Sequence, residues 1–181
     1  MTTIRDIRGH TFLKDDKLLI DTNVWLSVYG PIPYRRKRAV IYSNALANIK
    51  RVRCSVFIDV IVVSEYINQY ARLEFKQTGD QFNDFKHFRD SEYFQPVAKN
   101  IATSVMGILN NCARCGSGFP EMNISTVLGD FAGGDKDFND QVIAGICKKQ
   151  GLQLLTDDGD FNVPDVLVIT ANNQLLSVAA N

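Results

Sequence analysis

The sequence predicts a single α/β domain over residues 1–181, in which a central parallel sheet of about four to five strands has helices on both faces. Short apolar runs alternate along the chain with longer amphipathic segments, which is the pattern of repeated strand–helix–strand units. No stretch rich in Gly, Pro or Ser is long enough to separate two domains. A length of 181 residues also suits one domain with a substantial core.

The predicted strands are short apolar runs that end at polar or turn-forming residues. They cover 17–21, 54–58, 152–156 and 166–169. Apolar residues at helical spacing predict helices over 24–29, 34–50, 60–76, 97–113, 142–147 and 171–179, and shorter ones over 82–88 and after Ser125. Asp59 is the predicted N-cap of its helix, Ser125 that of the short helix, and Gly151 the residue that ends the helix before it. Phe82, Phe85 and Phe88 share one helix face, which indicates core packing rather than base stacking.

The composition is that of an ordinary globular protein, with 45% hydrophobic and 22% charged residues. No apolar run approaches the roughly 18 residues of a membrane span, and the first 17 residues lack the apolar segment of a secretory signal. We therefore expect a cytoplasmic protein that does not contact a membrane. Cys112 and Cys115 have C-x-x-C spacing, but no second pair accompanies them. We interpret them as two thiols on a helix rather than as a metal or redox site.

Basic residues gather in the first part of the chain. Residues 1–70 carry 11 Lys and Arg against 6 Asp and Glu, whereas residues 71–181 carry 9 against 14. Two basic groups lie at the two ends of the predicted helix 34–50: Arg35, Arg36, Lys37 and Arg38 at its start, and Lys50, Arg51 and Arg53 at its end. They form either a solvated surface or a patch that contacts nucleic-acid phosphates.

Carboxylates follow strands or open helices at four places, namely Asp21, Glu65, 135–140 and 157–160. In a parallel sheet these places converge on the carboxyl edge, where ligands of α/β proteins bind. Asp21 taken alone suits a helix N-cap, and Glu65 taken alone suits the surface of an amphipathic helix. Together the carboxylates would repel one another unless protons or a cation neutralised them. Oxygen ligands without His or thiolate neighbours favour Mg²⁺ or Mn²⁺.

Four segments resemble the motifs of the PIN-domain ribonucleases, particularly the toxin endoribonucleases of bacterial toxin–antitoxin pairs. They are Leu19-Ile20-Asp21-Thr22-Asn23, Val63-Ser64-Glu65-Tyr66, Asp140-Gln141-Val142-Ile143-Ala144 and Leu154-Leu155-Thr156-Asp157-Asp158-Gly159-Asp160-Phe161. The resemblance covers roughly residues 17–170 and is weakest over 77–125. It implies a PIN-like fold in which Asp21, Glu65, Asp140 and Asp158 are the catalytic, metal-binding carboxylates, with Asn23 and Thr156 as polar neighbours.

Two of these assignments have alternatives. Asp135 or Asp137 could take the place of Asp140, although only Asp140 is followed directly by the apolar start of the family's helix. Asp160 could take the place of Asp158, which has the family's spacing from Thr156.

The resemblance further implies hydrolysis of RNA phosphodiester bonds with Mg²⁺ or Mn²⁺, through water activated by the metal. Single-stranded RNA would lie on the basic residues, and the partners would be a cognate antitoxin and a second copy of the chain in a homodimer. The alternatives are a non-toxin PIN nuclease in RNA processing or decay, and a catalytically silent PIN-like RNA-binding module. A haloacid-dehalogenase-type phosphatase is disfavoured, because position 23 is Asn and not a second Asp.

Overall fold

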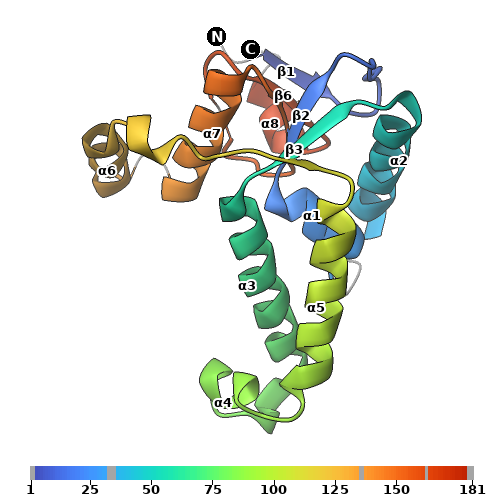
Figure 1. Ribbon diagram of the computed structural model, residues 1–181, viewed down its shortest axis with the longest axis vertical. Helices are drawn as coiled ribbons and strands as arrows, with labels where there is room; N and C mark the ends of the chain where they lie inside the picture. Colours follow the sequence, from blue (N-terminus) through green and yellow to red (C-terminus); the bar gives the residue numbers. More distant parts are fainter. Residues whose placement is uncertain (1–2, 32–35, 135–136, 162, 179–181) are drawn as a thin grey trace.

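The computed structural model describes residues 3–31, 36–134, 137–161 and 163–178. Six strands in these residues form one parallel sheet in the order β1-β6-β5-β2-β3-β4 (Figure 1). Their bounds are Thr3–Asp6 (β1), Lys17–Ile20 (β2), Ser55–Ile58 (β3), Ala113–Arg114 (β4), Gln153–Leu155 (β5) and Leu167–Thr170 (β6). The parallel α/β fold is confirmed, with one or two strands more than predicted.

The two unpredicted strands lie at the edges of the sheet. β1 has no buried residue, and β4 is only two residues long, so neither has the apolar run that identifies a strand in a sequence. The helix predicted over 97–113 ends at Leu109 instead. Cys112 and Cys115 therefore flank β4 and do not lie on a helix, which corrects the prediction. Burial raises the pKa of the Cys112 thiol to about 12, so this thiol is poorly suited to bind a metal.

The described residues also form eight α-helices, of which seven lie between strands and α8 follows the last strand. Their bounds are Thr22–Tyr29 (α1), Arg36–Val52 (α2), Val60–Gln77 (α3), Phe85–Arg89 (α4), Phe94–Leu109 (α5), Ile124–Ala132 (α6), Phe138–Gln150 (α7) and Asn173–Val178 (α8). The crossovers from β2 to β3 and from β3 to β4 run toward one edge of the sheet, and the crossover through α7 returns toward the other. Because parallel crossovers are right-handed, the returning helix packs on the opposite face.

Short polar residues fix the starts of several helices. Asp21, Asp59, Asp84, Asn123 and Asp137 each accept a backbone N–H of the first turn with the side chain. Asp59 caps α3, as predicted. The cap of α6 is Asn123 and not Ser125, which lies inside the helix. Gly151 ends α7 with φ 62°, the left-handed conformation for which the sequence predicted a glycine.

The centre of the sheet is covered on both faces. Leu18, Leu19, Ile20, Leu154, Leu155, Val168 and Ile169 have no more than 1% exposure. Strands buried in this way read as continuous apolar runs. Polar side chains at the ends of β2 and β5 are consequently held in an apolar surrounding, and this is the feature that sets up the site. No helix within the described ranges is long and apolar enough to cross a membrane.

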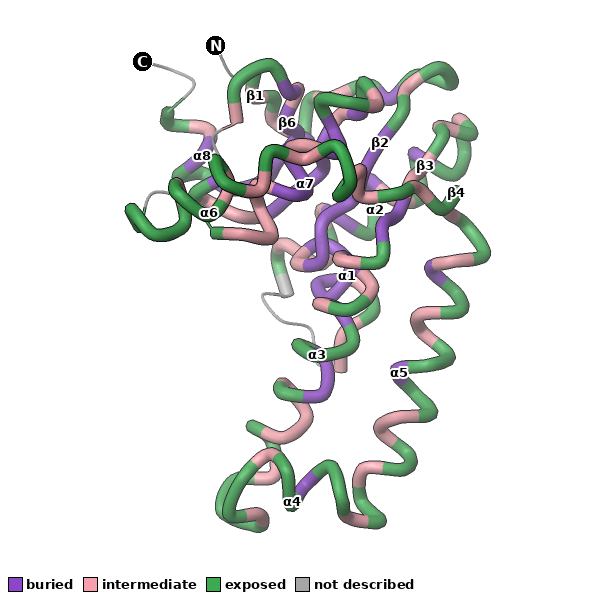
Figure 2. The backbone as a smooth tube through the Cα atoms, turned by 60° about the vertical axis from the view of Figure 1, so that its left-hand side comes forward, coloured by how far each residue is buried: buried purple, intermediate pink, exposed green. Residues whose placement is uncertain are grey.

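Helices α3 and α5 lie side by side and extend away from the sheet as an arm, with α4 at its tip (Figures 1 and 2). The rings of Phe82 and Phe85 contact the buried Phe88, with centroids 5.4 and 6.3 Å from it, and Phe75 and Phe94 complete the cluster. The predicted packing role of these aromatic residues is confirmed, but α4 begins only at Phe85, so Phe82 does not share its helix face as predicted. They form a small core of their own at the tip of the arm, where Figure 2 shows most of the chain exposed.

Candidate active site at the carboxyl edge of the sheet

Asp21 is the residue at which β2 leaves the core. Its Oδ1 accepts the Thr22 N–H at 2.6 Å, so it caps α1, and its Oδ2 accepts the Thr156 hydroxyl and the Asn23 amide, both at 2.7 Å. The side chain is only 5% exposed. The pKa of Asp21 is raised to about 6, mainly by burial and to a smaller extent by the nearby Glu65 and Asp158, while the hydrogen bond from Thr156 works in the opposite direction.

The Thr156 hydroxyl joins Asp21 to the loop that follows β5. It donates to Asp21 and accepts the Asp158 N–H at 3.0 Å. Asn23 adds a second connection, because its amide donates to the Thr156 hydroxyl at 3.2 Å and its Oδ1 accepts the Asp157 N–H at 2.9 Å. The two polar residues that the sequence indicated beside Asp21 therefore fix the position of the backbone that carries Asp158.

Glu65 lies in the second turn of α3, half-buried. Its Oε2 accepts the Thr22 hydroxyl at 3.2 Å, and its Oε1 accepts the Gln69 amide at 2.6 Å. Burial is the main cause that raises the pKa of Glu65, and the neighbouring Asp137 adds to it. Because the hydroxyl of α1 orients it toward the sheet edge, Glu65 is not a solvated surface residue.

Asp140 lies in the first turn of α7, one turn after the cap residue Asp137. The pKa of Asp140 is raised to about 7, first by burial and then by the nearby carboxylates of Asp158, Asp21, Asp137 and Glu65. Asp137 uses its Oδ1 to accept the Asn139 N–H at 2.8 Å. Asp135, the other alternative in this segment, lies outside the described residues.

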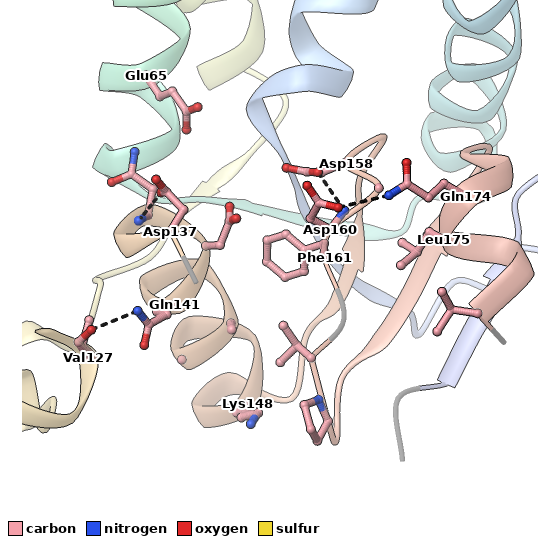
Figure 3. A pocket seen from close by; sticks show the side chains of 18 of the residues that line it. Glu65, Val127, Asp137, Gln141, Lys148, Asp158, Asp160, Phe161, Gln174 and Leu175 are labelled. Atoms are coloured by element: carbon pink, nitrogen blue, oxygen red, sulfur yellow. Dashed lines mark hydrogen bonds between the residues drawn. The ribbon is translucent and has the colours of Figure 1, made fainter. Parts of the chain in front are cut away.

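Glu65, Asp137 and Asp140 line one open groove of about 1040 Å³, whereas the buried Asp21 is not part of its lining. Figure 3 shows Glu65 from α3, Asp137 from the start of α7, and Asp158 and Asp160 from the loop after β5 around it. Asp160 donates its N–H to Asp158 Oδ1 at 3.0 Å and accepts the Gln174 amide at 3.1 Å. Asp158 and Asp160, the two alternatives that the sequence left open, therefore both line the groove.

The donor chemistry of the groove fits a hard divalent cation, because carboxylate oxygens surround it without a thiolate or an imidazole. Within the described ranges, no three Asp, Glu, His or Cys side chains lie close enough together to ligate one ion as they stand. Mg²⁺ commonly takes only one or two protein carboxylates and fills its octahedron with water and substrate oxygens. Uncompensated carboxylates also repel one another, as the raised pKa of Asp140 reflects, so a cation would draw them together.

The PIN-domain family model matches residues 18–167 of the chain. The chain belongs to the PIN-domain family. PIN domains are nucleases, which agrees with the acidic groove. Among solved structures, VapBC2 from Rickettsia felis bound to a DNA fragment from the promoter superposes with a TM-score of 0.53 at 13% identity, covering 85% of this chain and 98% of the other. PAE2754 from Pyrobaculum aerophilum gives 0.46 at 14% identity, with 94% and 95% covered. No curated protein matches the sequence significantly.

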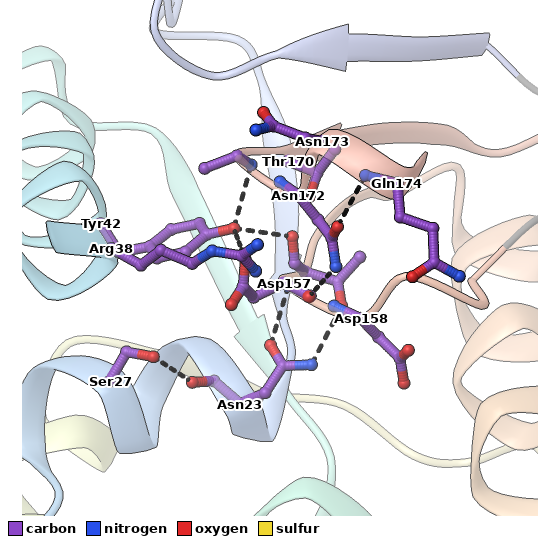
Figure 4. A network of polar contacts seen from close by, with 12 residues as sticks. Asn23, Ser27, Arg38, Tyr42, Asp157, Asp158, Thr170, Asn172, Asn173 and Gln174 are labelled. Carbon is purple, nitrogen blue, oxygen red and sulfur yellow. Dashed lines mark hydrogen bonds and ion pairs between the residues drawn. The ribbon is translucent and has the colours of Figure 1, made fainter. Parts of the chain in front are cut away.

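This PIN domain holds the residue before Asp158 in a buried polar network (Figure 4). The Asp157 Oδ1 lies 2.6 Å from the Arg38 guanidinium and accepts the Tyr42 hydroxyl at 2.9 Å. Its carbonyl oxygen accepts the Asn172 amide at 2.7 Å. The Tyr42 hydroxyl in turn accepts the Ala171 N–H at 3.0 Å, which connects α2 to the end of β6.

The predicted RNA-binding residues do not form one surface. Arg38 is engaged by Asp157 at the carboxyl edge, whereas Lys50, Arg51 and Arg53 are exposed at the other end of α2, about 20 Å away. That end leads into the first residue of β3 and therefore lies at the amino edge of the sheet. Lys37 is exposed near Arg38, Arg36 begins α2, and Arg35 lies outside the described residues.

Several residues that support the PIN site were not predicted from the sequence. Thr22 and Gln69 orient Glu65, and Tyr42 and Asn172 hold Asp157. Thr22 could have been found from the Asp-Thr-Asn triplet, since it opens the helix beside Asp21. Tyr42 and Asn172 could not, because their partners are more than ten residues distant along the chain.

Proposed function

We propose that this PIN domain is an endoribonuclease that depends on Mg²⁺ or Mn²⁺ and serves as the toxin of a toxin–antitoxin pair. The single observation that supports this best is the convergence of carboxylates from three segments, α3, the start of α7 and the loop after β5, on one open groove. The pKa of Asp140 in this groove is raised to about 7, first by burial and then by the neighbouring carboxylates. Such a groove lowers the stability of the protein without a bound ligand, because like charges held together in a half-buried site destabilise the fold. Sites that retain such a cost commonly perform chemistry.

Asp21, Glu65, Asp140 and Asp158 are the residues that would hold the metal ion. The ion, when bound, supplies Lewis acidity for attack by water on a phosphodiester. The chain itself supplies the positioning. Thr156 and Asn23 fix the Asp21 carboxylate, and Thr22 and Gln69 fix that of Glu65. Occupation of the site would favour the ionised form of Asp140, so metal uptake and proton release are coupled.

The proposed substrate is single-stranded RNA. The groove is open and lies between helices α3, α6, α7 and α8 and the loop after β5, so an extended strand reaches the half-buried carboxylates more easily than a base-paired duplex does. The toxin role follows from the resemblance of the four acidic motifs. VapBC2 from Rickettsia felis, whose structure holds a DNA fragment from the promoter, shares the fold with this chain. A small antitoxin and a homodimer are the partners that this role implies.

A cleavage assay tests the activity. The wild type should cut a single-stranded RNA oligonucleotide with Mg²⁺ or Mn²⁺ and stop when EDTA is added. Asp21→Asn and Asp140→Asn remove the charge and keep the shape of the side chain, and each should lower the rate by more than about 100-fold. Asp15→Asn is the matched control, because Asp15 is an exposed carboxylate at the amino edge of the sheet. Equal rates for Asp140→Asn and Asp15→Asn would refute the assignment.

A further inference from the structure

A second groove adjoins the acidic one. It measures about 480 Å³ and lies between α3 and the loop after β5. Asp158, Gly159 and Asp160 line both grooves, so this loop is the ridge at which they meet. A polymer whose scissile bond lies beside Asp158 can therefore continue into one groove on one side of that bond and into the other groove on the other side.

One face of α3 runs from the acidic site into the second groove. It presents Glu65, Gln69, Arg72 and Lys76 at the spacing i, i+4, i+7 and i+11, which places them in one row along a helix. Glu65 lines the first groove, and the other three line the second. The row thus begins with the carboxylate of the candidate active site, continues with the amide that donates to it, and ends with two cations.

The charges of the second groove are arranged asymmetrically. The α3 wall carries Arg72 and Lys76, while the opposite wall carries Asp158 and Asp160. In the described part of the chain neither cation has a carboxylate within ion-pair distance, although the Arg72 guanidinium lies 4.8 Å from the centroid of the Phe85 ring, which steadies it. A polyanion in this groove is repelled by one wall and attracted by the other, so its phosphates should follow α3.

The distances of Arg72 and Lys76 from Glu65 suit contacts with nucleotides next to the scissile bond. At 1.5 Å per residue, Arg72 and Lys76 lie about 10 and about 17 Å from Glu65 along the helix axis. They are too far along the helix to act on the scissile phosphate itself. We infer that Arg72 and Lys76 bind the backbone phosphates of the nucleotides on one side of the scissile bond of a single-stranded RNA. This inference rests on the proposed nuclease function and assigns the direction in which the substrate leaves the site.

The test compares the double variant Arg72→Gln/Lys76→Gln with Lys86→Gln/Lys99→Gln, which removes two exposed cations of the same arm that line neither groove. For a single strand, each phosphate contact makes the slope of log affinity against log salt concentration steeper by about 0.7. Loss of two contacts should therefore make the slope of log(1/KM) against log salt concentration shallower by about 1.4. If the double variant and the wild type have the same KM at 1 M salt, the KM of the double variant should be about 10-fold higher than that of the wild type at 0.2 M salt. The kcat should stay within about 2-fold, because remote contacts bind ground state and transition state alike.

Substrate length separates a binding role from a structural one. Shortening the RNA on one side of the cleaved bond should abolish the difference between wild type and double variant, and shortening it on the other side should preserve that difference. A double variant that keeps the salt slope of its control, or a difference that does not depend on which side is shortened, overturns the inference while leaving the nuclease function intact. A wild type that cleaves no RNA with either metal overturns both.

Discussion

Removal of the Asp140 charge should stabilise the metal-free protein, although it abolishes activity. The pKa of Asp140 is about 7 in the fold and about 3.9 in an unfolded chain, so the native state binds more protons between these values and stability falls as the pH rises through this window. The interval corresponds to at most about 4 kcal/mol, and partial exposure of the side chain reduces the expected penalty to about 1–2 kcal/mol. Asp140 forms no hydrogen bond among the described residues that Asn would break.

The assay is thermal or urea unfolding in EDTA as a function of pH. Asp140→Asn should unfold about 3–6 °C above the wild type at pH 8. The difference should shrink toward zero as the pH falls to about 3, where the carboxyl group is protonated in both the native and the unfolded state. Saturating Mg²⁺ should stabilise the wild type and reduce or reverse the difference. Asp15→Asn controls for a general effect of net charge. If Asp140→Asn is no more stable than this control at pH 8, burial and the neighbouring carboxylates do not destabilise the ionised form of Asp140 as inferred.

Two further predictions concern the supports of the site. Arg38→Met removes the ion pair of the buried Asp157 carboxylate and should lower the free energy of unfolding by about 2–4 kcal/mol in urea titrations. Arg38→Met/Asp157→Asn should recover part of that loss, and no recovery would contradict the pairing. Thr156→Val deprives Asp21 of a donor and the Asp158 N–H of an acceptor, so it should cost about 1–3 kcal/mol and slow RNA cleavage at least about 10-fold. Thr126→Val, on the exposed side of α6, is its control, and equal cleavage rates for the two would exclude a positioning role of Thr156.

The central strands could be predicted because their burial on both faces leaves a continuous apolar run, as in Leu18-Leu19-Ile20. The same logic led to Asp21, since a carboxylate directly after such a run lies at the carboxyl edge. It failed for β1 and β4, which are half-exposed edge strands with little apolar content. Helix ends were predictable where one residue decides them, as at Gly151, and less so where several candidates compete, as at the start of α6.

The basic start of α2 shows that a local sequence pattern does not identify a partner that is distant in the chain. Arginines in the first turn of a helix oppose its dipole, and the sequence offered solvent or phosphate as their partner. The partner of Arg38 is Asp157, 119 positions later in the chain. Only the packing of α2 against the end of β5 brings the two together, and no spacing rule within the sequence connects them. Asn172 is a similar case, because its contact with the Asp157 carbonyl depends on the neighbouring strand β6.

This pairing explains why two consecutive acids are tolerated at the end of β5. Asp157 turns inward, where Arg38 neutralises it and Tyr42 donates to it, so it adds little to the repulsion in the groove. Its backbone N–H and C=O are both occupied by side-chain amides, those of Asn23 and Asn172, and the next N–H is held by Thr156. The backbone before Asp158 therefore has little freedom, and the Asp158 carboxylate must face the groove. One acid of the pair is a structural ion that orients the other.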